Sequence, residues 1–281
     1  MYRKKMSGSA FRKASHKAVT LLGMSGSGKT MLASKLPRHN WFHYSGDYRI
    51  GTRYMGEPIL DNVKREAMKV PFLADLLRSD SIYLCHNITI NNLAPIATFL
   101  GMIGNPSLGG LSVAEFKRRQ SLHRDAEIAA MMDVREFIGK AQETYGYPNF
   151  INDAGGSLCE LDEPSVLRQL AEDTLILYLK PPEAMLAKII ERSLLDPKPM
   201  YYQSSFLDRV LPEYLAEKDL NSADEIVPND FFCWIFPRLV EHRLPRYQTI
   251  ADEYGVVLEA DRIDGIRGEA DFIELICEAL G

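Results

Sequence analysis

The chain has 281 residues, of which 46% are hydrophobic and 25% charged, and its formal net charge is −5. This composition is typical of a globular protein with a sizeable core, and no apolar run approaches the roughly 20 residues needed to cross a bilayer. The four cysteines are scattered without a C-x-x-C pair, which favours reduced core residues in a cytoplasmic protein over a disulfide framework or a zinc site.

A basic leader precedes an acidic body. The first 17 residues hold six Lys or Arg side chains and no acidic residue: Arg3, Lys4, Lys5, Arg12, Lys13 and Lys17. We interpret residues 1–16 as a basic, flexible tail, with a targeting peptide or a nucleic-acid-binding arm as the alternatives. The acidic remainder argues against nucleic acid as a partner, and no membrane partner is expected.

The most informative stretch is Gly23–Thr30, which matches the phosphate-binding loop (Walker A) G-x-x-x-x-G-K-[ST] at every fixed position. The apolar run at 18–22 before it predicts a buried strand, and residues 30–36 after it predict a helix. Strand, loop and helix form the context that this motif requires, so the sequence predicts binding of a nucleoside triphosphate.

Each residue type in the loop suits the binding of phosphates. Glycines let the backbone approach closely, and successive N–H groups form a nest for anions. Lys29 can reach the β- and γ-phosphates, and the Thr30 hydroxyl can take one position on Mg²⁺. The predicted cofactors are therefore ATP and Mg²⁺. The predicted cofactor-binding residues are Gly23, Ser25, Gly26, Ser27, Gly28, Lys29 and Thr30.

A second strand is predicted over 41–47, and it ends in Asp47. Ligands of open α/β sheets sit at the carboxyl ends of strands, which puts Asp47 on the same edge as the phosphate loop. Arg49 and Arg53 follow, and an acid with two guanidinium groups beside a phosphate site indicates recognition of an acceptor molecule. The alternative is a solvated loop in which Asp47 caps a helix.

The stretch 57–147 is mostly helical by pattern, and we expect it to be an insertion between strands two and three. Short helices are predicted over 59–68 and 71–77. A longer helix opens at the capping box Ser112–Glu115 and continues to about residue 145. Its basic cluster, 117–124, indicates either a surface that faces an anionic substrate or a solvated helix face.

A third strand is predicted to begin at Asn149 and to end in Asp153, with Gly155 and Gly156 in the following turn. At this strand end Asp153 is a candidate for the acid that holds Mg²⁺ through water. The two glycines would let a substrate approach the backbone closely. A plain turn between a strand and a helix is the competing interpretation.

The fourth strand, 174–179, precedes a helix over 183–194 that carries Arg192, and then a loop rich in proline that carries Lys198. This arrangement is typical of a mobile lid whose positive charge closes over a transferring phosphoryl group. An ordinary connection between helices with exposed basic residues is the alternative.

The rest of the chain completes the sheet. The predicted elements are a helix over 204–218, a further helix around 231–235 that Pro237 and Pro245 interrupt, a fifth strand over 256–260 and a final helix over 271–280. Strands that alternate with helices predict a single α/β domain over 17–281, with a five-stranded parallel sheet and the three-layer fold of P-loop NTPases.

In these features the chain resembles the P-loop small-molecule kinases, above all the shikimate kinase and gluconate kinase group. The matching residues are Gly23–Thr30, Ser45-Gly46-Asp47, Glu115-Phe116-Lys117, Ala154-Gly155-Gly156, the lid-like Arg192, Asp196 and Lys198-Pro199, and Arg243-Leu-Pro245-Arg246-Tyr247 followed by Ala251. The resemblance covers roughly residues 17–56 and 148–281. The chain is far longer than such kinases, and its insertion has no counterpart in them.

The resemblance implies a kinase-type fold and phosphoryl transfer from ATP. Together with Arg49, Arg53 and Arg243, it leads us to expect a phosphotransferase that acts on a small, anionic, hydroxyl-bearing metabolite. It implies that Asp47 orients or deprotonates the acceptor hydroxyl and that Arg243 contacts an acidic group. One acid stands where shikimate kinases have two, which argues against shikimate itself. The predicted catalytic residues are Lys29, Asp47, Arg192 and Lys198, the predicted metal ligands are Thr30 and Asp153, and the predicted substrate-binding residues are Asp47, Arg49, Arg53, Gly155, Gly156 and Arg243.

Two other functions stay open. One is a regulatory or switch ATPase that hydrolyses a nucleoside triphosphate and binds a protein partner through residues 57–147. The other is a kinase of a nucleotide, a nucleotide sugar or a nucleic-acid end, for which the basic stretch 117–124 leaves room.

Overall fold

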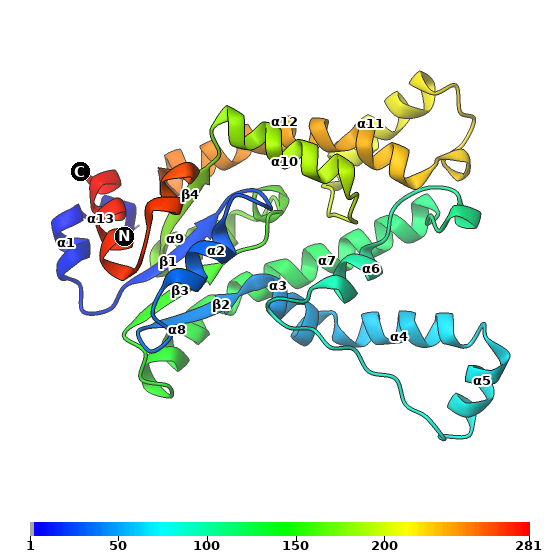
Figure 1. The fold of residues 1–281 in the computed structure, drawn as a ribbon, viewed down its shortest axis with the longest axis horizontal. Helices are drawn as coiled ribbons and strands as arrows, with labels where there is room; N and C mark the ends of the chain where they lie inside the picture. The colour runs from blue at the N-terminus through cyan, green and yellow to red at the C-terminus, as the bar shows by residue number, and fades with distance from the viewer. Residues whose placement is uncertain (1–2) are drawn as a thin grey trace.

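The computed structural model describes residues 3–281, and it contains a five-stranded sheet in which neighbouring strands are parallel (Figure 1). The strands are β1 (Ala18–Leu22), β2 (Trp41–Ser45), β3 (Asn149–Asp153), β4 (Leu175–Lys180) and β5 (Gly255–Glu259). Their order is β2-β3-β1-β4-β5, so the strand before the glycine loop lies in the middle. The predicted α/β class, with its five-stranded parallel sheet and P-loop type of fold, is confirmed.

Helices cover both faces of the sheet because its strands are apolar on both sides. Val19 and Leu21 point to one face, and Ala18 and Leu22 point to the other. The first face packs against α1 (Gly8–Lys13), α2 (Lys29–Lys35) and α13 (Glu269–Leu280), and the second against α7 (Val113–Met132), α8 (Val134–Glu143), α9 (Pro164–Asp173) and α12 (Pro228–Tyr254). Burial on both faces is the usual setting of a parallel sheet.

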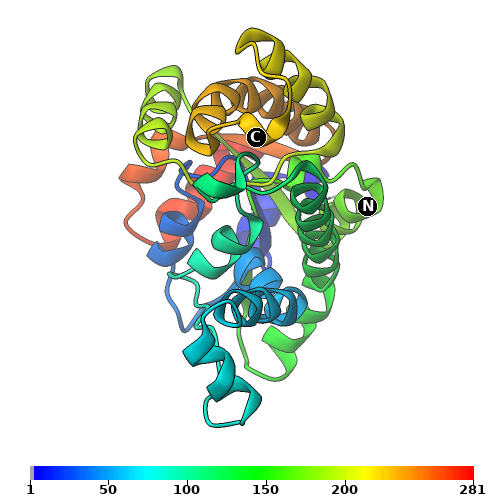
Figure 2. The same ribbon diagram turned by 90° about the vertical axis from the view of Figure 1, so that its right-hand side faces the viewer.

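A run of helices connects β2 to β3, as predicted for the insertion. It consists of α3 (Gly46–Arg49), a π-helical turn (Ile50–Tyr54), α4 (Gly56–Ala67), α5 (Pro71–Arg78), α6 (Ala94–Leu100), α7 and α8. Helices α4 and α5 form the end of the molecule that projects farthest from the sheet in Figure 1, and in Figure 2 this end faces the viewer. Helix α6 lies closer in and packs on α7.

The long helix predicted from Ser112 onwards is in fact two helices. Its start is confirmed, because Ser112 Oγ accepts a hydrogen bond from the Glu115 N–H at 3.4 Å. The chain bends at Asp133, between α7 and α8. The Asp133 carboxylate accepts hydrogen bonds from Arg49 and Tyr54, which ties the bend to the turn that follows β2.

The N-terminal segment packs against the body. Helix α1 carries Phe11, whose side chain is only 3% exposed in the core shared with α13. A Cβ on Gly8 would lie 2.6 Å from the Cys277 carbonyl oxygen, so the two helices are in close contact. This part of the predicted flexible tail is therefore a docked helix, because Phe11 is buried and Arg12 forms an ion pair with Glu274 of α13. The first two residues of that tail lie outside the described residues.

Helix α12 continues through Pro237 and Pro245, where the sequence predicted interruptions. Each proline removes one backbone hydrogen bond from the helix. Burial of a long apolar face offsets this loss: it includes Phe231, Phe232, Ile235, Phe236, Leu239 and Val240. Helices α10 (Glu183–Leu195) and α11 (Ser204–Glu217) pack against α12 and form the upper layer in Figure 1.

No helix within residues 3–281 is both long enough and apolar enough to cross a membrane.

Candidate active site

The phosphate loop leaves the central strand and turns tightly into α2. Gly26 and Gly28 have φ angles of 86° and 92°, in the left-handed region that residues with a side chain rarely adopt. A Cβ on Gly23 would lie 3.0 Å from the Leu179 carbonyl oxygen on the neighbouring strand. The predicted cofactor-binding residues thus share one compact turn at the carboxyl end of β1.

Lys29 is held inside this turn. Its side chain is 7% exposed, and Nζ donates to the carbonyl oxygens of Gly23 and Met24 at 2.7 and 3.0 Å. Burial lowers the pKa of Lys29, and the nearby carboxylates of Asp153 and Asp47 act in the opposite direction. The ammonium group therefore lies among acids at the edge of the sheet where the resemblance placed the chemistry.

The pairing of the strands brings Asp153 to the loop. Because β3 pairs with both β1 and β2, Asp153 lies opposite Leu21 on one side and Ser45 on the other. The Thr30 hydroxyl donates to Asp153 Oδ2 at 2.6 Å, and His43 Nε2 lies 3.7 Å from the same oxygen. The two predicted metal ligands are therefore neighbours.

The chemistry of this pair fits Mg²⁺, which prefers oxygen ligands and keeps several water molecules. Nowhere in residues 3–281 do three or more His, Cys, Asp or Glu side chains gather as a metal cage. From the protein, Mg²⁺ would therefore draw on Thr30 and Asp153, and phosphate oxygens and water would supply the rest.

Asp47 lies in the first turn of α3 rather than at the end of a strand, because β2 ends at Ser45. Ser45, and not Asp47, caps this helix: its Oγ accepts a hydrogen bond from the Tyr48 N–H at 3.2 Å. Burial and the charge of Asp153 raise the pKa of Asp47 to about 6, and Lys29 opposes them. A carboxyl group with this pKa is ionised at neutral pH and remains basic enough to take a proton.

The Gly155-Gly156 turn is glycine because other groups occupy the space of a side chain. A Cβ on Gly155 would lie 2.5 Å from Glu127 Oε1 and 3.1 Å from Asp47 Oδ1. A Cβ on Gly156 would lie 3.1 Å from the Ser25 backbone nitrogen. The turn therefore lies between the phosphate loop and Asp47, and groups of the protein itself occupy the space that the sequence analysis reserved for a substrate.

Sequence reasoning missed a buried polar cluster behind this turn. Glu127 is fully buried, its Oε2 accepts a hydrogen bond from Ser157, and its Oε1 has no hydrogen-bond partner among the described residues. His123 Nδ1 lies 3.8 Å from Glu127 Oε2. Burial raises the pKa of Glu127 to about 8, and burial and Arg243 lower the pKa of His123 to about 4. A signal was available, since residues four apart share a helix face and point to the same place.

Arg243 is deeply buried and paired. Its Nε and Nη2 both donate to Glu160 Oε2, at 2.8 and 2.5 Å, and Nη2 also donates to the Tyr201 carbonyl oxygen at 2.8 Å. Burial alone would lower the pKa of Arg243, but Glu160 holds it above its usual value. The predicted substrate-binding arginine thus reaches the site with its charge already balanced.

The other two arginines lie elsewhere. Arg49 Nε donates to Asp133 Oδ2 at 2.8 Å, and its guanidinium group stacks on Phe137 with 4.9 Å to the ring centre. Arg53 is exposed. Neither side chain lines the two cavities described below.

Of the two predicted lid residues, Arg192 near the end of α10 lies close to the phosphate loop, and Lys198 lies in the segment after α10. Arg192 Nη2 lies 3.7 Å from the position of a Cβ on Gly26. Lys198 Nζ pairs with Asp196 at 2.8 Å, and both of these side chains are exposed.

Two cavities meet at the loop. One, which we call the lid cavity, has a volume of about 470 Å³ and lies between the phosphate loop, α10 and α12. The other, the α6 cavity, has a volume of about 610 Å³ and lies between Asp47, α6 and residues 198–201. They share the lining residues Ser25, Lys198, Met200 and Arg243. A group bound to the loop would therefore be open to both.

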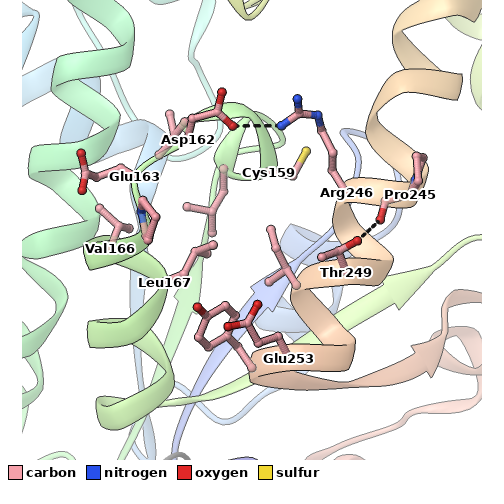
Figure 3. Close-up of a pocket in the computed structure, with 14 residues that line it drawn as sticks. Cys159, Asp162, Glu163, Val166, Leu167, Pro245, Arg246, Thr249 and Glu253 are labelled. Atoms are coloured by element: carbon pink, nitrogen blue, oxygen red, sulfur yellow. Dashed lines mark hydrogen bonds and ion pairs between the residues drawn. The ribbon is translucent and has the colours of Figure 1, made fainter.

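A third pocket lies apart from these residues, between α9 and α12 (Figure 3). Its volume is about 340 Å³, Cys159 lies at its inner side, and Arg246 and Asp162 form an ion pair at its edge at 3.0 Å. None of the predicted site residues lines it.

Comparison with known proteins adds little to this geometry. No protein-family model matches the chain, and no curated protein matches it. Among solved structures, a shikimate kinase from Bacteroides thetaiotaomicron is similar to this chain with a TM-score of 0.33 and 14% sequence identity, over 80% of this chain and 98% of that one. A TM-score of this size supports no conclusion on activity. The P-loop fold class therefore stands on the motif, the strand order and the parallel pairing.

Proposed function

We propose that the protein is a cytoplasmic ATP-dependent phosphotransferase, a kinase that transfers the γ-phosphoryl group to a hydroxyl on a small molecule. The observation that carries this proposal is the position of Asp47. This carboxyl group lines the α6 cavity, which shares Ser25 of the phosphate loop with the lid cavity. A switch that only hydrolyses ATP does not require a second cavity with a potential base at the site of transfer.

Catalysis of phosphoryl transfer consists mainly of positioning the reactants and stabilising charge, and each of the site residues would serve one of these roles. The loop backbone and Lys29 would hold the phosphates, and Thr30 and Asp153 would hold Mg²⁺, which would supply positive charge to neutralise the phosphates. Arg192 and Lys198 would approach from the lid.

In the transfer itself, Asp47 would accept the proton of the acceptor hydroxyl. The acceptor oxygen then forms a bond to the γ-phosphorus while the bond from this phosphorus to the bridging oxygen breaks, and ADP leaves. The raised pKa of Asp47 suits this role, because the group is ionised before transfer and can hold the proton during it.

The alternatives receive less support. The basic residues that left a nucleic-acid or nucleotide acceptor open are engaged within the chain: Lys117 pairs with Asp208, and Arg118 and Arg119 pair with Glu115. A regulatory ATPase with a protein partner on the insertion keeps one observation in its favour, the projection of α4 and α5 from the body (Figure 1).

The test is release of ADP from Mg-ATP by the purified protein, alone and with pools of hydroxy acids, sugars, nucleosides and nucleotides. Lys29→Ala serves as the blank, and Lys140→Ala on the exposed side of α8 serves as the matched control. We expect one pool to increase ADP release with wild type and with Lys140→Ala, and not with Lys29→Ala. Release that no pool changes would favour the regulatory ATPase.

A further inference from the structure

We propose that the acceptor is an uncharged, partly apolar alcohol, with its hydroxyl at Asp47 and its apolar part against α6. This inference rests on the proposed kinase function, and it replaces the anionic acceptor that the sequence indicated. Three features of the α6 cavity carry it: the balance of charge in its wall, its apolar side and the uncharged groups at its inner end.

The first feature is that no cation in the wall is left for an anionic acceptor. Apart from histidine, the charged residues that line the cavity are Asp47, Lys198 and Arg243. Buried Arg243 is held by Glu160 at 2.5 and 2.8 Å. Lys198 forms only an exposed pair with Asp196 at 2.8 Å, and the proposed function assigns its charge to the transferring phosphoryl group. Asp47 thus leaves the wall negative, and an anion there would lose its hydration without a partner.

The second feature is an apolar side. It consists of side chains from α6 and from the residue before it, namely Leu93, Ile96, Ala97 and Leu100, and Met200 adds to the lining. Ile96 and Leu100 are 6% and 4% exposed, so they are fixed in the core and do not shift freely. With about 610 Å³, the cavity is in the range that holds drug-sized ligands and is much larger than a small hydroxy acid needs.

The third feature is that the inner end offers hydrogen bonds without a net charge. His123 and Ser157 line the cavity beside Asp47, and the His123 ring stacks on Tyr201 with 5.5 Å between ring centres. Burial keeps the imidazole neutral, with one donor and one acceptor nitrogen, and Glu127 stands behind it at 3.8 Å. A neutral donor and acceptor next to a carboxylate suit a second hydroxyl on the same substrate.

The test compares pairs of acceptors in which an anionic group takes the place of a neutral hydroxyl or hydroxymethyl group. The first pairs are 1-phenyl-1,2-ethanediol against mandelate, and uridine against uridine 5′-monophosphate. Binding to the protein with a non-hydrolysable ATP analogue is followed by saturation-transfer NMR, and transfer is followed by formation of the phosphate ester. We expect the neutral member of each pair to bind at least about tenfold more tightly, since a buried polar mismatch has effects of this size or larger.

Two variants locate the acceptor. Ala97→Trp fills the apolar side, and we expect it to weaken binding of the neutral members by about tenfold or more; Ala216→Trp on the exposed side of α11 is the matched control. Thr98→Lys adds a free cation to the wall and should strengthen binding of the anionic members. The comparison is Thr98→Met, whose side chain has similar length and no charge. The affinity for ATP and the melting temperature show that each variant is folded.

Failure of the proposed acceptor class and failure of the proposed kinase function give different results. Tighter binding of the anionic members, no binding of the neutral ones, or no effect of Ala97→Trp would overturn the inference while kinase activity stands. Absence of transfer to every acceptor, with ATP hydrolysed to phosphate, would overturn the kinase function and the inference together.

Discussion

Replacement of Asp47 by Asn should remove transfer and at the same time make the protein more stable at pH 7. The carboxyl group has a pKa of about 6 in the folded protein, against 3.8 for an unperturbed aspartate. The shift arises from burial and from the neighbouring charge of Asp153. The folded state therefore disfavours the ionised form that activity needs.

The size of the effect follows from the linkage between pKa and folding. A difference of about two units between the folded and unfolded pKa of Asp47 corresponds to about 3 kcal/mol. This is the largest amount by which ionisation of Asp47 can lower the free energy of unfolding. Because the pKa of an acid is raised, the loss begins as pH rises through the unfolded value and is complete above the folded value. At pH 7 Asp47→Asn should thus gain at most about 3 kcal/mol, and below pH 3.8 it should gain nothing.

The assay is urea unfolding of wild type and Asp47→Asn at pH 7 and near pH 4, together with the rate of phosphoryl transfer. We expect the gain in stability to shrink toward acid pH and transfer to fall by about 10²–10⁴-fold. Equal stability at both pH values would refute the reasoning that Asp47 is held in a desolvated position beside Asp153. Full transfer by Asp47→Asn would refute its role as a base.

Four further predictions concern Asp47, Glu127, Arg243 and Phe11. Transfer by wild type should fall about tenfold per pH unit below about pH 6 as Asp47 is protonated, and a flat profile of kcat/KM from pH 5 to 8 would contradict this. Glu127→Gln should stabilise the protein at pH 7 by at most about 3 kcal/mol and not below pH 4.5, since its pKa is raised from 4.5 to about 8; urea unfolding at both pH values would detect this. Arg243→Met would leave Glu160 buried without its partner and should reduce the free energy of unfolding by about 3–5 kcal/mol, whereas Arg243→Met with Glu160→Met should recover part of it. Phe11→Ala should reduce it by about 3–5 kcal/mol if α1 is docked as described, and a loss below about 1 kcal/mol would show that α1 is not part of the folded core.

Local signals predicted the phosphate loop and the edge of the sheet on which it lies. The glycines of Gly23–Thr30 permit the conformation of this loop, and the apolar strand before it determines the position of the loop in the sheet. The edge of the sheet that carries Asp47 and Asp153 was also predicted, because both residues were expected at the ends of strands, and parallel strands bring such residues to one edge. The order of the strands, β2-β3-β1-β4-β5, was not predicted. In the structure Asp153 lies beside the loop, with 2.6 Å between Thr30 Oγ1 and Asp153 Oδ2.

The sequence analysis missed contacts between residues that lie far apart in the chain. Arg49 looked available for a substrate, but the bend of the chain at Asp133 brings an acid to it from a distant helix. Arg243 likewise meets Glu160, and no local pattern reports such a pair. Helix α12 continues through two prolines, and helix α1 docks on the body although it carries basic residues. In both helices, burial of apolar side chains outweighs the local preference. The cytoplasmic location expected from the cysteines stays a prediction.

The most direct test of the proposed function follows the γ-phosphoryl group itself. ATP labelled at this group is incubated with the protein, Mg²⁺ and the pooled acceptors, and the label is separated into phosphate esters and inorganic phosphate. We predict that wild type moves the label into an ester of one acceptor and that Lys29→Ala and Asp47→Asn do not. Label that appears as inorganic phosphate alone, at a rate that no acceptor changes, would contradict the kinase and leave an ATPase.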